Sequence, residues 1–244
     1  MMNKSILILG ASSDVGLELI NKTHRNYETI IAHYNNREFE LKRLKEQIGD
    51  KLNIIKADFS LEHETDAFIK QVEKEVIYPT NIVHLPAANV RNINFHKSDW
   101  EHVEFDINIS LRSIYKIIQH FIKPMTKAKY GNIIFMLSSN TVTTPKYMLD
   151  YTIVKYALLG FMKALATEYA EKNIRVNAIS PSMIETKFLE NVPRLIVEQS
   201  ALNNPLKRNA VVDDIVPVLE FLLSDESNYI IGQNINISGG SIIG

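Results

Sequence analysis

The sequence has no cysteine, which excludes disulfide bonds, thiolate catalysis and cysteine-bound metals. Charge of one sign does not accumulate, because the formal net charge is −1, and we expect no nucleic-acid partner and no membrane partner. The seven histidines show no metal-ligand spacing, so we expect no metal site. No apolar run approaches the roughly 18 residues of a membrane span. The apolar stretch before Gly10 is too short for a signal peptide, and we expect a cytoplasmic protein.

What the sequence does contain is an alternation of two patterns over its 244 residues, 45% of them hydrophobic. Apolar runs typical of buried strands lie at 5–9, 29–32, 53–56, 81–85, 131–137, 174–179 and 230–237. Amphipathic runs typical of helices lie at 15–22, 37–48, 62–76, 99–126, from about 150 to 172, and at 213–223. We expect 99–126 to be bent or interrupted, and Asp150 to be the N-cap of its helix. Single helices between strands predict one α/β domain over 1–244, with a doubly wound, seven-stranded parallel sheet covered on both faces.

The stretch from Ser138 to Lys155 carries the side chains best suited to proton transfer. Tyr151 and Lys155 are four residues apart, so both project from one face of a helix. A nearby ammonium favours the phenolate, so we expect Lys155 to lower the pKa of Tyr151 from its ordinary ~10. Among ten tyrosines, such a pair with a lysine is expected about once by chance. Its context favours function, because Ser138 falls where the apolar run 131–137 ends, at the edge where open α/β sheets bind ligands.

The first strand-to-helix turn runs from Gly10 to Gly16 with the letters GASSDVG. Small residues here let the backbone approach a pyrophosphate, whose charge the N–H groups and dipole of the following helix would stabilise. The same residues also fit a tight turn with close helix packing. Its position at the start of the alternating series favours the phosphate site.

Together these features resemble the short-chain dehydrogenase/reductase family over essentially the whole chain. The family's catalytic set matches Asn108, Ser138, Tyr151 and Lys155, with Ser138 thirteen residues before Tyr151. Further matches lie at 175–181, at 184–186 and near the C-terminus at 224–240. The resemblance implies a Rossmann fold and a nicotinamide cofactor. It assigns cofactor contacts to Gly10, Ser12, Ser13, Asp14, Val15, Gly16, Asn35, Arg37, Asp58, Ala87, Tyr151, Lys155, Pro181, Ile184 and Thr186.

The mechanism that the resemblance implies is an interconversion of a carbonyl and an alcohol. Tyr151 would act as general acid or base, and Ser138 would hydrogen-bond the substrate oxygen. Lys155 would hold the cofactor ribose and tune Tyr151, while Asn108 would position a water that links Lys155 to solvent.

Two positions depart from the family pattern. The middle glycine of the turn is Asp14, which puts a carboxylate near the phosphates unless the side chain turns away to cap the helix. The family's Asn-Asn-Ala-Gly after the fourth strand is replaced by Leu85-Pro86-Ala87-Ala88. Since that loop steadies the cofactor floor, both departures bear on cofactor affinity.

The choice of cofactor depends on the end of the second strand. An acidic side chain there would accept the 2′-hydroxyl of NAD and repel a 2′-phosphate, and none is present. Asn35, Asn36 and Arg37 favour NADP(H), although Arg37 equally fits an exposed first-turn helix residue. We expect NADP(H) to be preferred, with NAD(H) as the alternative.

The substrate lid is expected around 186–210, where a long connection carries apolar side chains that suit a greasy or a sugar-like partner. The chain looks most like the 3-oxoacyl-[acyl-carrier-protein] reductases of the family, which implies reduction of a 3-oxoacyl thioester. Lys129 and Lys172 fall where those enzymes place basic residues for an acidic carrier protein, although lysines near helix ends are commonly only solvated.

Two alternatives stay open for the function. One is a reductase or dehydrogenase of a sugar, polyol or other small pathway-specific alcohol, and the other is a non-catalytic nucleotide-binding regulator. We also expect a homotetramer, because the helices at 99–126 and 150–172 carry apolar residues on more than one face. The residues behind this expectation are Ile114, Ile118, Phe121, Leu158, Phe161 and Leu165.

Overall fold

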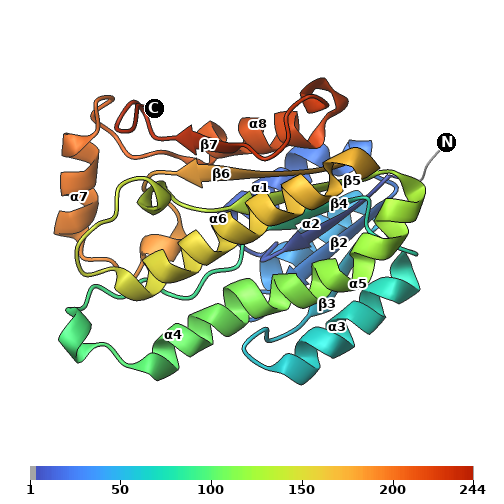
Figure 1. The fold of residues 1–244 in the computed structure, drawn as a ribbon, viewed down its shortest axis with the longest axis horizontal. Helices are drawn as coiled ribbons and strands as arrows, with labels where there is room; N and C mark the ends of the chain where they lie inside the picture. The colour runs from blue at the N-terminus through green and yellow to red at the C-terminus, as the bar shows by residue number, and fades with distance from the viewer. Residues whose placement is uncertain (1–3, 244) are drawn as a thin grey trace.

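One seven-stranded parallel sheet forms the centre of the protein in a computed structural model that describes residues 4–243. The strands follow the order β3-β2-β1-β4-β5-β6-β7 (Figure 1). Their bounds are β1 Ser5–Leu9, β2 Thr29–Tyr34, β3 Leu52–Lys56, β4 Asn81–His84, β5 Gly131–Met136, β6 Ile174–Pro181 and β7 Asn234–Ile237. The predicted doubly wound α/β fold is confirmed.

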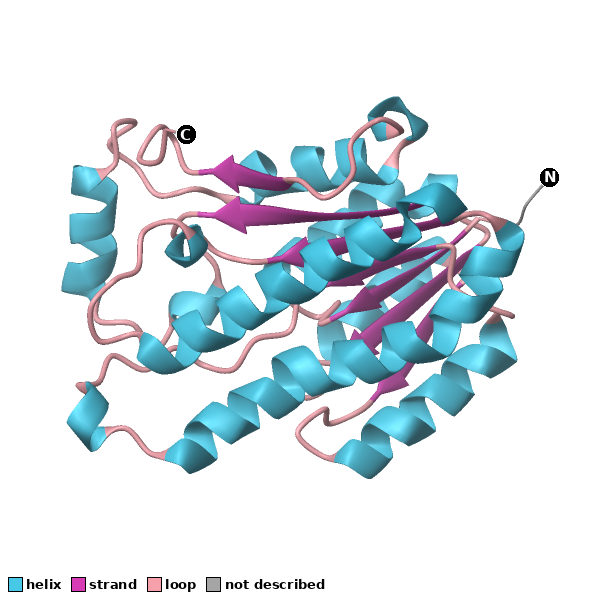
Figure 2. Ribbon diagram, in the orientation of Figure 1, coloured by secondary structure: helices cyan, strands magenta, loops and turns pink. Residues whose placement is uncertain are grey.

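Helices cover both faces of this sheet. The helices α1 (Asp14–Thr23), α2 (Phe39–Ile48) and α8 (Val212–Leu223) pack on one face. On the other face lie α3 (Glu62–Glu75), α5 (Ser113–Ala128) and α6 (Leu149–Tyr169), which stand in front of the sheet in Figure 1. A further helix, α7 (Arg194–Asn203), stands beyond the carboxyl ends of the strands, where the arrows in Figure 2 point.

The remaining helical pieces are short. The helix α4 (Trp100–Asp106) leads into α5 through the π-helical turn η3 (Ile107–Arg112), so the region 99–126 is interrupted as predicted. The 3₁₀ turns are η1 His24–Asn26, η2 Phe95–Lys97, η4 Ser139–Thr141, η5 Ala170–Lys172, η6 Lys187–Leu189 and η7 Asp225–Ser227.

Side chains on the two faces of the strands β1 to β6 enter two hydrophobic clusters. Leu7 and Phe135 face α5 and α6, whereas Ile8 and Ile134 face α1 and α8. Because both faces are buried, the strands read as continuous apolar runs rather than alternating ones. These continuous apolar runs are why most strands were located correctly from the sequence.

Several element boundaries differ from the prediction. The strand β2 runs on to Tyr34, and β7 begins only at Asn234, because Gly232 takes a left-handed conformation (φ 72°) that interrupts an extended chain. Asp150 is not the N-cap of α6, which begins at Leu149. Its side chain is buried in the first turn, where Arg91 pairs with it at 2.7 Å.

The residues from which we inferred a tetramer are also placed differently. Five of them belong to the protein's own core rather than to a free face, namely Ile114, Ile118, Phe121, Leu158 and Leu165. That argument for assembly is therefore wrong. Within residues 4–243, no helix combines the length and apolar character that a bilayer span needs.

Candidate active site

The carboxyl ends of the strands bring the predicted site residues to one edge of the sheet. Gly10 follows β1, Asp58 follows β3 and Ser138 follows β5. Strand order reverses between β1 and β4, the switch point where doubly wound sheets bind ligands. Gly10 lies at that point, since a Cβ added to it would lie 3.3 Å from the backbone nitrogen of Pro86.

The turn from Gly10 to Gly16 has the geometry of an anion site. Gly10 has φ 72°, and a Cβ at Gly16 would lie 2.6 Å from the carbonyl oxygen of Ala11, so only glycine fits there. The Ser13 hydroxyl accepts a hydrogen bond from the Gly16 N–H at 3.2 Å and caps α1. The N–H groups of Ser12, Asp14 and Val15 have no acceptor among residues 4–243. These free donors at a helix N-terminus fit a pyrophosphate.

His33 holds this turn in place through a hydrogen bond with Gly10, a role that the sequence reasoning missed. Its Nδ1 accepts the Gly10 N–H at 3.0 Å, and its Nε2 faces the Ala57 carbonyl oxygen at 3.0 Å. The ring stacks on Phe59 with centroids 3.9 Å apart. Burial lowers the pKa of His33 to about 4, although the Ala57 carbonyl and Asp58 act in the opposite direction. Had the second strand been extended past Ala32, a histidine inside a buried strand would have been the signal.

Asp14 does not point at the phosphate site. Its Oδ2 accepts a hydrogen bond from the backbone N–H of Lys187 at 2.7 Å. Since Ser13 caps the helix, the Asp14 carboxylate is free to contact the lid instead.

The three predicted catalytic side chains of β5 and α6 lie together. Tyr151 and Lys155 project from one face of α6, and the Lys155 Nζ lies 5.3 Å from the centroid of the Tyr151 ring. Lys155 Nζ also donates to the Met136 carbonyl at 2.9 Å, which ties α6 to the end of β5. The Ser138 hydroxyl, nearly buried at 9% exposure, interacts with the Tyr151 phenol. The carbonyl edge of a substrate would meet Ser138 and Tyr151 together.

The electrostatics of this set differ from the expectation. Burial raises the pKa of Tyr151 to about 12, with hydrogen bonding by Ser138 acting to lower it and Asp106 to raise it. Burial lowers the pKa of Lys155 to about 8, and the Asp106 carboxylate raises it. The expected net lowering of the Tyr151 pKa by Lys155 is therefore wrong for this structure, because desolvation of the phenolate dominates.

Asn108 lies in the π-helical turn η3, where its carbonyl oxygen accepts the N–H of Ser113. Such π-turns inside longer helices often occur at functional sites. Two residues earlier, the buried Asp106 accepts hydrogen bonds from the Ser110 hydroxyl at 2.7 Å and the Ala88 N–H at 3.3 Å. Asp106 thus holds the loop that departs from the family pattern at 85–88. The sequence reasoning missed this residue, since a carboxylate near Asn108 carries no signal by itself.

Arg91 is a third residue that the sequence reasoning missed. It bridges Asp99, the N-cap of α4, and Asp150, with 2.7 Å to each carboxylate. The Ile93 N–H also donates to the Tyr147 carbonyl at 2.8 Å. The loop after β4 is therefore tied to the loop that leads into Tyr151.

The residues predicted to select the cofactor follow β2. Arg37 pairs with Glu190 of the predicted lid at 3.7 Å. The position that directly follows β2 is occupied by Asn35 rather than by an acidic residue. The segment 186–210, predicted to be a substrate lid, follows a short bridge between Ile184 and Ala210 and includes η6 and α7. Ala87 follows β4 and Pro181 ends β6, so both reach the same edge, and Thr186 begins the lid.

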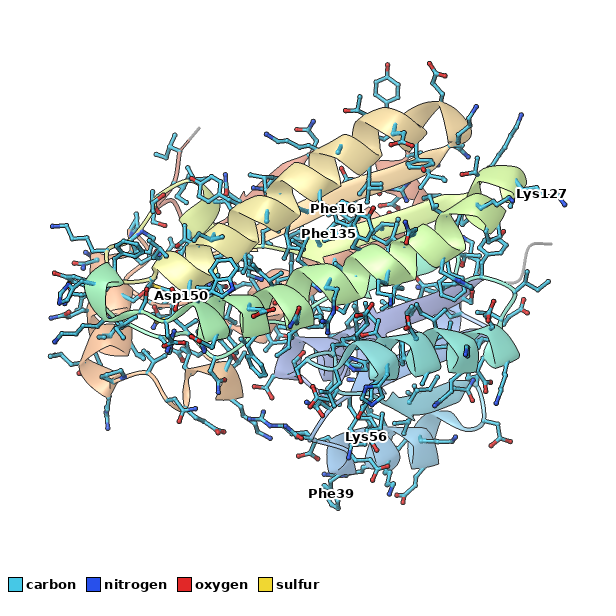
Figure 3. The ribbon with its side chains drawn as sticks, turned by 60° about the horizontal axis from the view of Figure 1, so that its bottom comes forward. Phe39, Lys56, Lys127, Phe135, Asp150 and Phe161 are labelled. Atoms are coloured by element: carbon cyan, nitrogen blue, oxygen red, sulfur yellow. The ribbon has the colours of Figure 1, made fainter. Side chains whose placement is uncertain are left out.

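The two lysines considered for a carrier protein lie elsewhere. Lys129 ends α5 and Lys172 ends η5, and the side chain of Asn173 donates to the Lys129 carbonyl at 3.0 Å. Figure 3 shows Lys127, two residues before Lys129, at the opposite end of the molecule from Asp150, the neighbour of Tyr151. These lysines thus lie close together but far from the catalytic set of the same chain.

Comparison with known proteins agrees with this geometry. Residues 10–241 match the family model described as enoyl-(acyl carrier protein) reductase. The chain is 26% identical to an acetoacetyl-CoA reductase of Allochromatium vinosum, over 98% of both proteins. It is 28% identical to a 3-oxoacyl-[acyl-carrier-protein] reductase of Chlamydia trachomatis, again over 98% of both. The 3-ketoacyl-(acyl-carrier-protein) reductase of Brucella melitensis, solved with NADH, superposes with a TM-score of 0.87 at 22% identity, covering 98% of each chain.

The fold likeness agrees with the family match, which spans nearly the whole chain. We conclude that the protein belongs to the short-chain dehydrogenase/reductase family of NAD(P)-dependent oxidoreductases.

Proposed function

We propose that the protein reduces the keto group of a 3-oxoacyl thioester with NADPH, using Tyr151 as the proton donor. The observation that carries this proposal is the class of relatives matched over nearly their full length, which includes an acetoacetyl-CoA reductase and 3-oxoacyl-[acyl-carrier-protein] reductases. The juxtaposition of Ser138, Tyr151 and Lys155 supplies the chemistry that such a reduction needs.

Each side chain of the set has one task in this proposal. When bound, NADPH supplies the hydride. Ser138 donates a hydrogen bond to the substrate carbonyl oxygen, and Tyr151 gives its phenolic proton to that oxygen as negative charge develops on it. The Lys155 ammonium, beside the ring, stabilises the phenolate that results and would hold the cofactor ribose. Asn108 holds the water through which the proton of Tyr151 is replaced.

The raised pKa of Tyr151 suits this direction of reaction. At neutral pH a phenol with a pKa of about 12 remains protonated, so the donor is loaded before the substrate arrives. The pKa of Lys155 is lowered to about 8, so the lysine is charged at neutral pH but can release its proton at a pH only slightly higher.

The preference for NADPH rests on the end of β2. Arg37 presents a guanidinium there, and guanidinium groups bind phosphates well because of their planar, multiple donors. An acidic residue that would accept a 2′-hydroxyl is absent from Asn35 and Asn36. The free N–H groups of the Gly10 to Gly16 turn would hold the pyrophosphate in either cofactor.

The lid offers apolar surface for an acyl chain. Four of its large apolar side chains are exposed, namely Phe188, Leu195, Leu202 and Leu206. Exposed apolar side chains on a segment beside the ligand-binding edge of the sheet suit a lid that closes on an acyl group.

Delivery by a carrier protein requires more than one copy of the chain. A carrier bound at Lys129 and Lys172 would lie at the amino edge of the sheet, a strand length of ~20 Å from its own Ser138. In this proposal, a carrier bound there serves the site of a neighbouring copy. We propose a homotetramer, supported by exposed apolar side chains along α4 to α6 rather than by the buried ones: Trp100, Phe105, Tyr115, Ile153 and Tyr156.

A reductase of a small, pathway-specific alcohol is the second candidate. The remote position of Lys129 and Lys172 favours it, because a substrate free of any carrier needs no basic docking surface. A regulator without catalysis is the third possibility, and the assembled catalytic set argues against it.

The test is turnover of purified protein with NADPH against acetoacetyl-CoA, small thioesters, sugars and cyclic ketones, with Tyr151→Phe as the control. We expect thioester reduction that falls by ~10²–10⁴ in the variant, the usual contribution of general acid catalysis. Turnover confined to the sugars or cyclic ketones would establish the second candidate. NADPH binding without any turnover would establish the third.

A further inference from the structure

The lid contacts the cofactor side of the protein through one short segment, residues 185–190, which we call the lid limb. Its Lys187 N–H donates to Asp14 at 2.7 Å, and the Lys187 ammonium lies 3.6 Å from Glu40. Glu190 pairs with Arg37 at 3.7 Å. Asp14 begins α1, Glu40 lies in α2, and Arg37 lies in the loop between β2 and α2. Two residues of the predicted cofactor site, Asp14 and Arg37, and Glu40 of α2 thus hold the lid limb.

The contact at Asp14 exists because of a departure from the family pattern. A glycine at this position has no side chain with which to accept the Lys187 N–H. Ser13 already caps α1, so the Asp14 carboxylate is not needed for the helix. Its hydrogen bond to the lid is charge-assisted, which makes it stronger than a neutral one.

Backbone hydrogen bonds anchor the lid limb at Glu185, and side chains outside the lid contact it at Lys187 and Glu190. The Glu185 N–H donates to the Ala210 carbonyl at 2.8 Å, and the Ala210 N–H donates to the Met183 carbonyl at 3.0 Å. These bonds anchor the point where the lid leaves β6. Beyond that anchor, Asp14, Glu40 and Arg37 are the partners found for the limb outside the lid among residues 4–243.

We propose that Asp14 and Glu190 form a clasp that positions the lid over the cofactor site, and that Glu190 is a cofactor-specificity residue. A 2′-phosphate competes with Glu190 for Arg37, whereas a 2′-hydroxyl leaves the pair intact. Binding of NADPH then breaks the Glu190–Arg37 pair and leaves this end of the lid limb free to contact the substrate. The hydrogen bond between Asp14 and the Lys187 N–H keeps the lid limb in place. The specificity role of Glu190 rests on the proposed use of NADPH. The positioning role of Asp14 does not depend on it.

The Asp14 half is tested on the protein without cofactor, by hydrogen–deuterium exchange of the peptide that contains Lys187. Asp14→Ala removes the acceptor, and we expect exchange there to become faster by on the order of tenfold, the equivalent of one charge-assisted hydrogen bond. Asp14→Asn keeps an acceptor oxygen and should retain most of the protection. Unchanged exchange in Asp14→Ala, at an unchanged melting temperature, would overturn the clasp.

The Glu190 half is tested by fluorescence titration of NADPH and NADH against two matched variants. Glu190→Gln removes the competitor of the 2′-phosphate, and we expect the Kd for NADPH to fall up to about fivefold, as for an exposed ion pair, with the NADH Kd unchanged. Glu198→Gln removes the same charge from the same lid, where Glu198 pairs with Arg194 at 2.7 Å, and should change neither Kd.

The outcomes separate this inference from the proposed function. An equal gain for both cofactors, or an equal gain in both variants, would show general electrostatics and overturn the specificity role. A protein that binds NADH alone would refute the proposed cofactor and, with it, the Glu190 half, while the exchange experiment would still decide the Asp14 half.

Discussion

Protonation of His33 should destabilise the fold at mildly acidic pH. The neutral ring accepts the Gly10 N–H and donates to the Ala57 carbonyl, so a second ring proton would point at the Gly10 N–H. Burial accordingly lowers the pKa of His33 from 6.5 to about 4. In the unfolded chain the ordinary value returns, and between these two values the unfolded state binds more protons than the folded one.

The sign and size of the effect follow from this difference. The stabilisation by neutral His33 is complete above pH ~6.5 and is lost as the pH falls toward ~4, below which both states are protonated. At 1.36 kcal/mol per pKa unit, the loss over this window is about 3 kcal/mol. That is a large part of the 5–15 kcal/mol that typically stabilises a domain.

Replacing His33 with Asn isolates the effect. The Asn oxygen can accept the Gly10 N–H but does not titrate, so the acid-dependent loss attributed to His33 should disappear. The lost Ala57 bond and Phe59 stack should cost about 1–3 kcal/mol at neutral pH. Urea unfolding followed by circular dichroism, at a series of pH values from 4 to 7.5, gives both quantities.

Two comparisons make the result decisive. The second buried histidine, His84, also has a pKa well below its ordinary value, but it is present in both proteins and its contribution cancels. His96→Asn makes the same substitution at an exposed position and should leave the pH dependence unchanged. If His33→Asn loses stability with falling pH as steeply as the wild type, His33 is not the group that titrates, and our account of the turn is wrong.

Three further predictions concern the catalytic set and the distant lysines. Asp106→Asn should move the basic limb of the pH–rate profile for reduction to lower pH, because Asp106 raises the pKa of Lys155, and an unmoved limb in kcat/KM would refute this role. Lys155→Ala should weaken NADPH binding as well as turnover, whereas Tyr151→Phe should reduce turnover alone by ~10²–10⁴, as cofactor titration beside kinetics will show. Changing Lys129 and Lys172 together to Glu should slow only a carrier-bound substrate, mainly in association and with strong salt dependence; equal effects on a free thioester would discard the docking role.

The sequence was sufficient for the parts of the site that depend on local spacing. Tyr151 and Lys155 share a helix face because they are four residues apart, and Ser138 reaches them because a buried parallel strand must end at the ligand-binding edge. Neither inference needs knowledge of the tertiary contacts.

The parts that the sequence did not reveal depend on which distant groups meet. Asp150 suits an N-cap by residue type, but Arg91, 59 residues away along the chain, holds it inside the first turn. The lid partner of Asp14 is 173 residues away. Local propensity cannot identify such partners, because the competing arrangements differ only in contacts that form after the chain has folded.

Asp106 connects these non-local contacts to the protonation of the catalytic set. One carboxylate raises the pKa of Tyr151 and also that of Lys155, so it favours the protonated form of both groups. The same carboxylate is held by Ser110 and by the Ala88 N–H of the loop that departs from the family pattern. At neutral pH the site therefore holds a protonated phenol beside a charged lysine. Asp106 thus links the protonation of the catalytic set to the loop after β4 that departs from the family pattern.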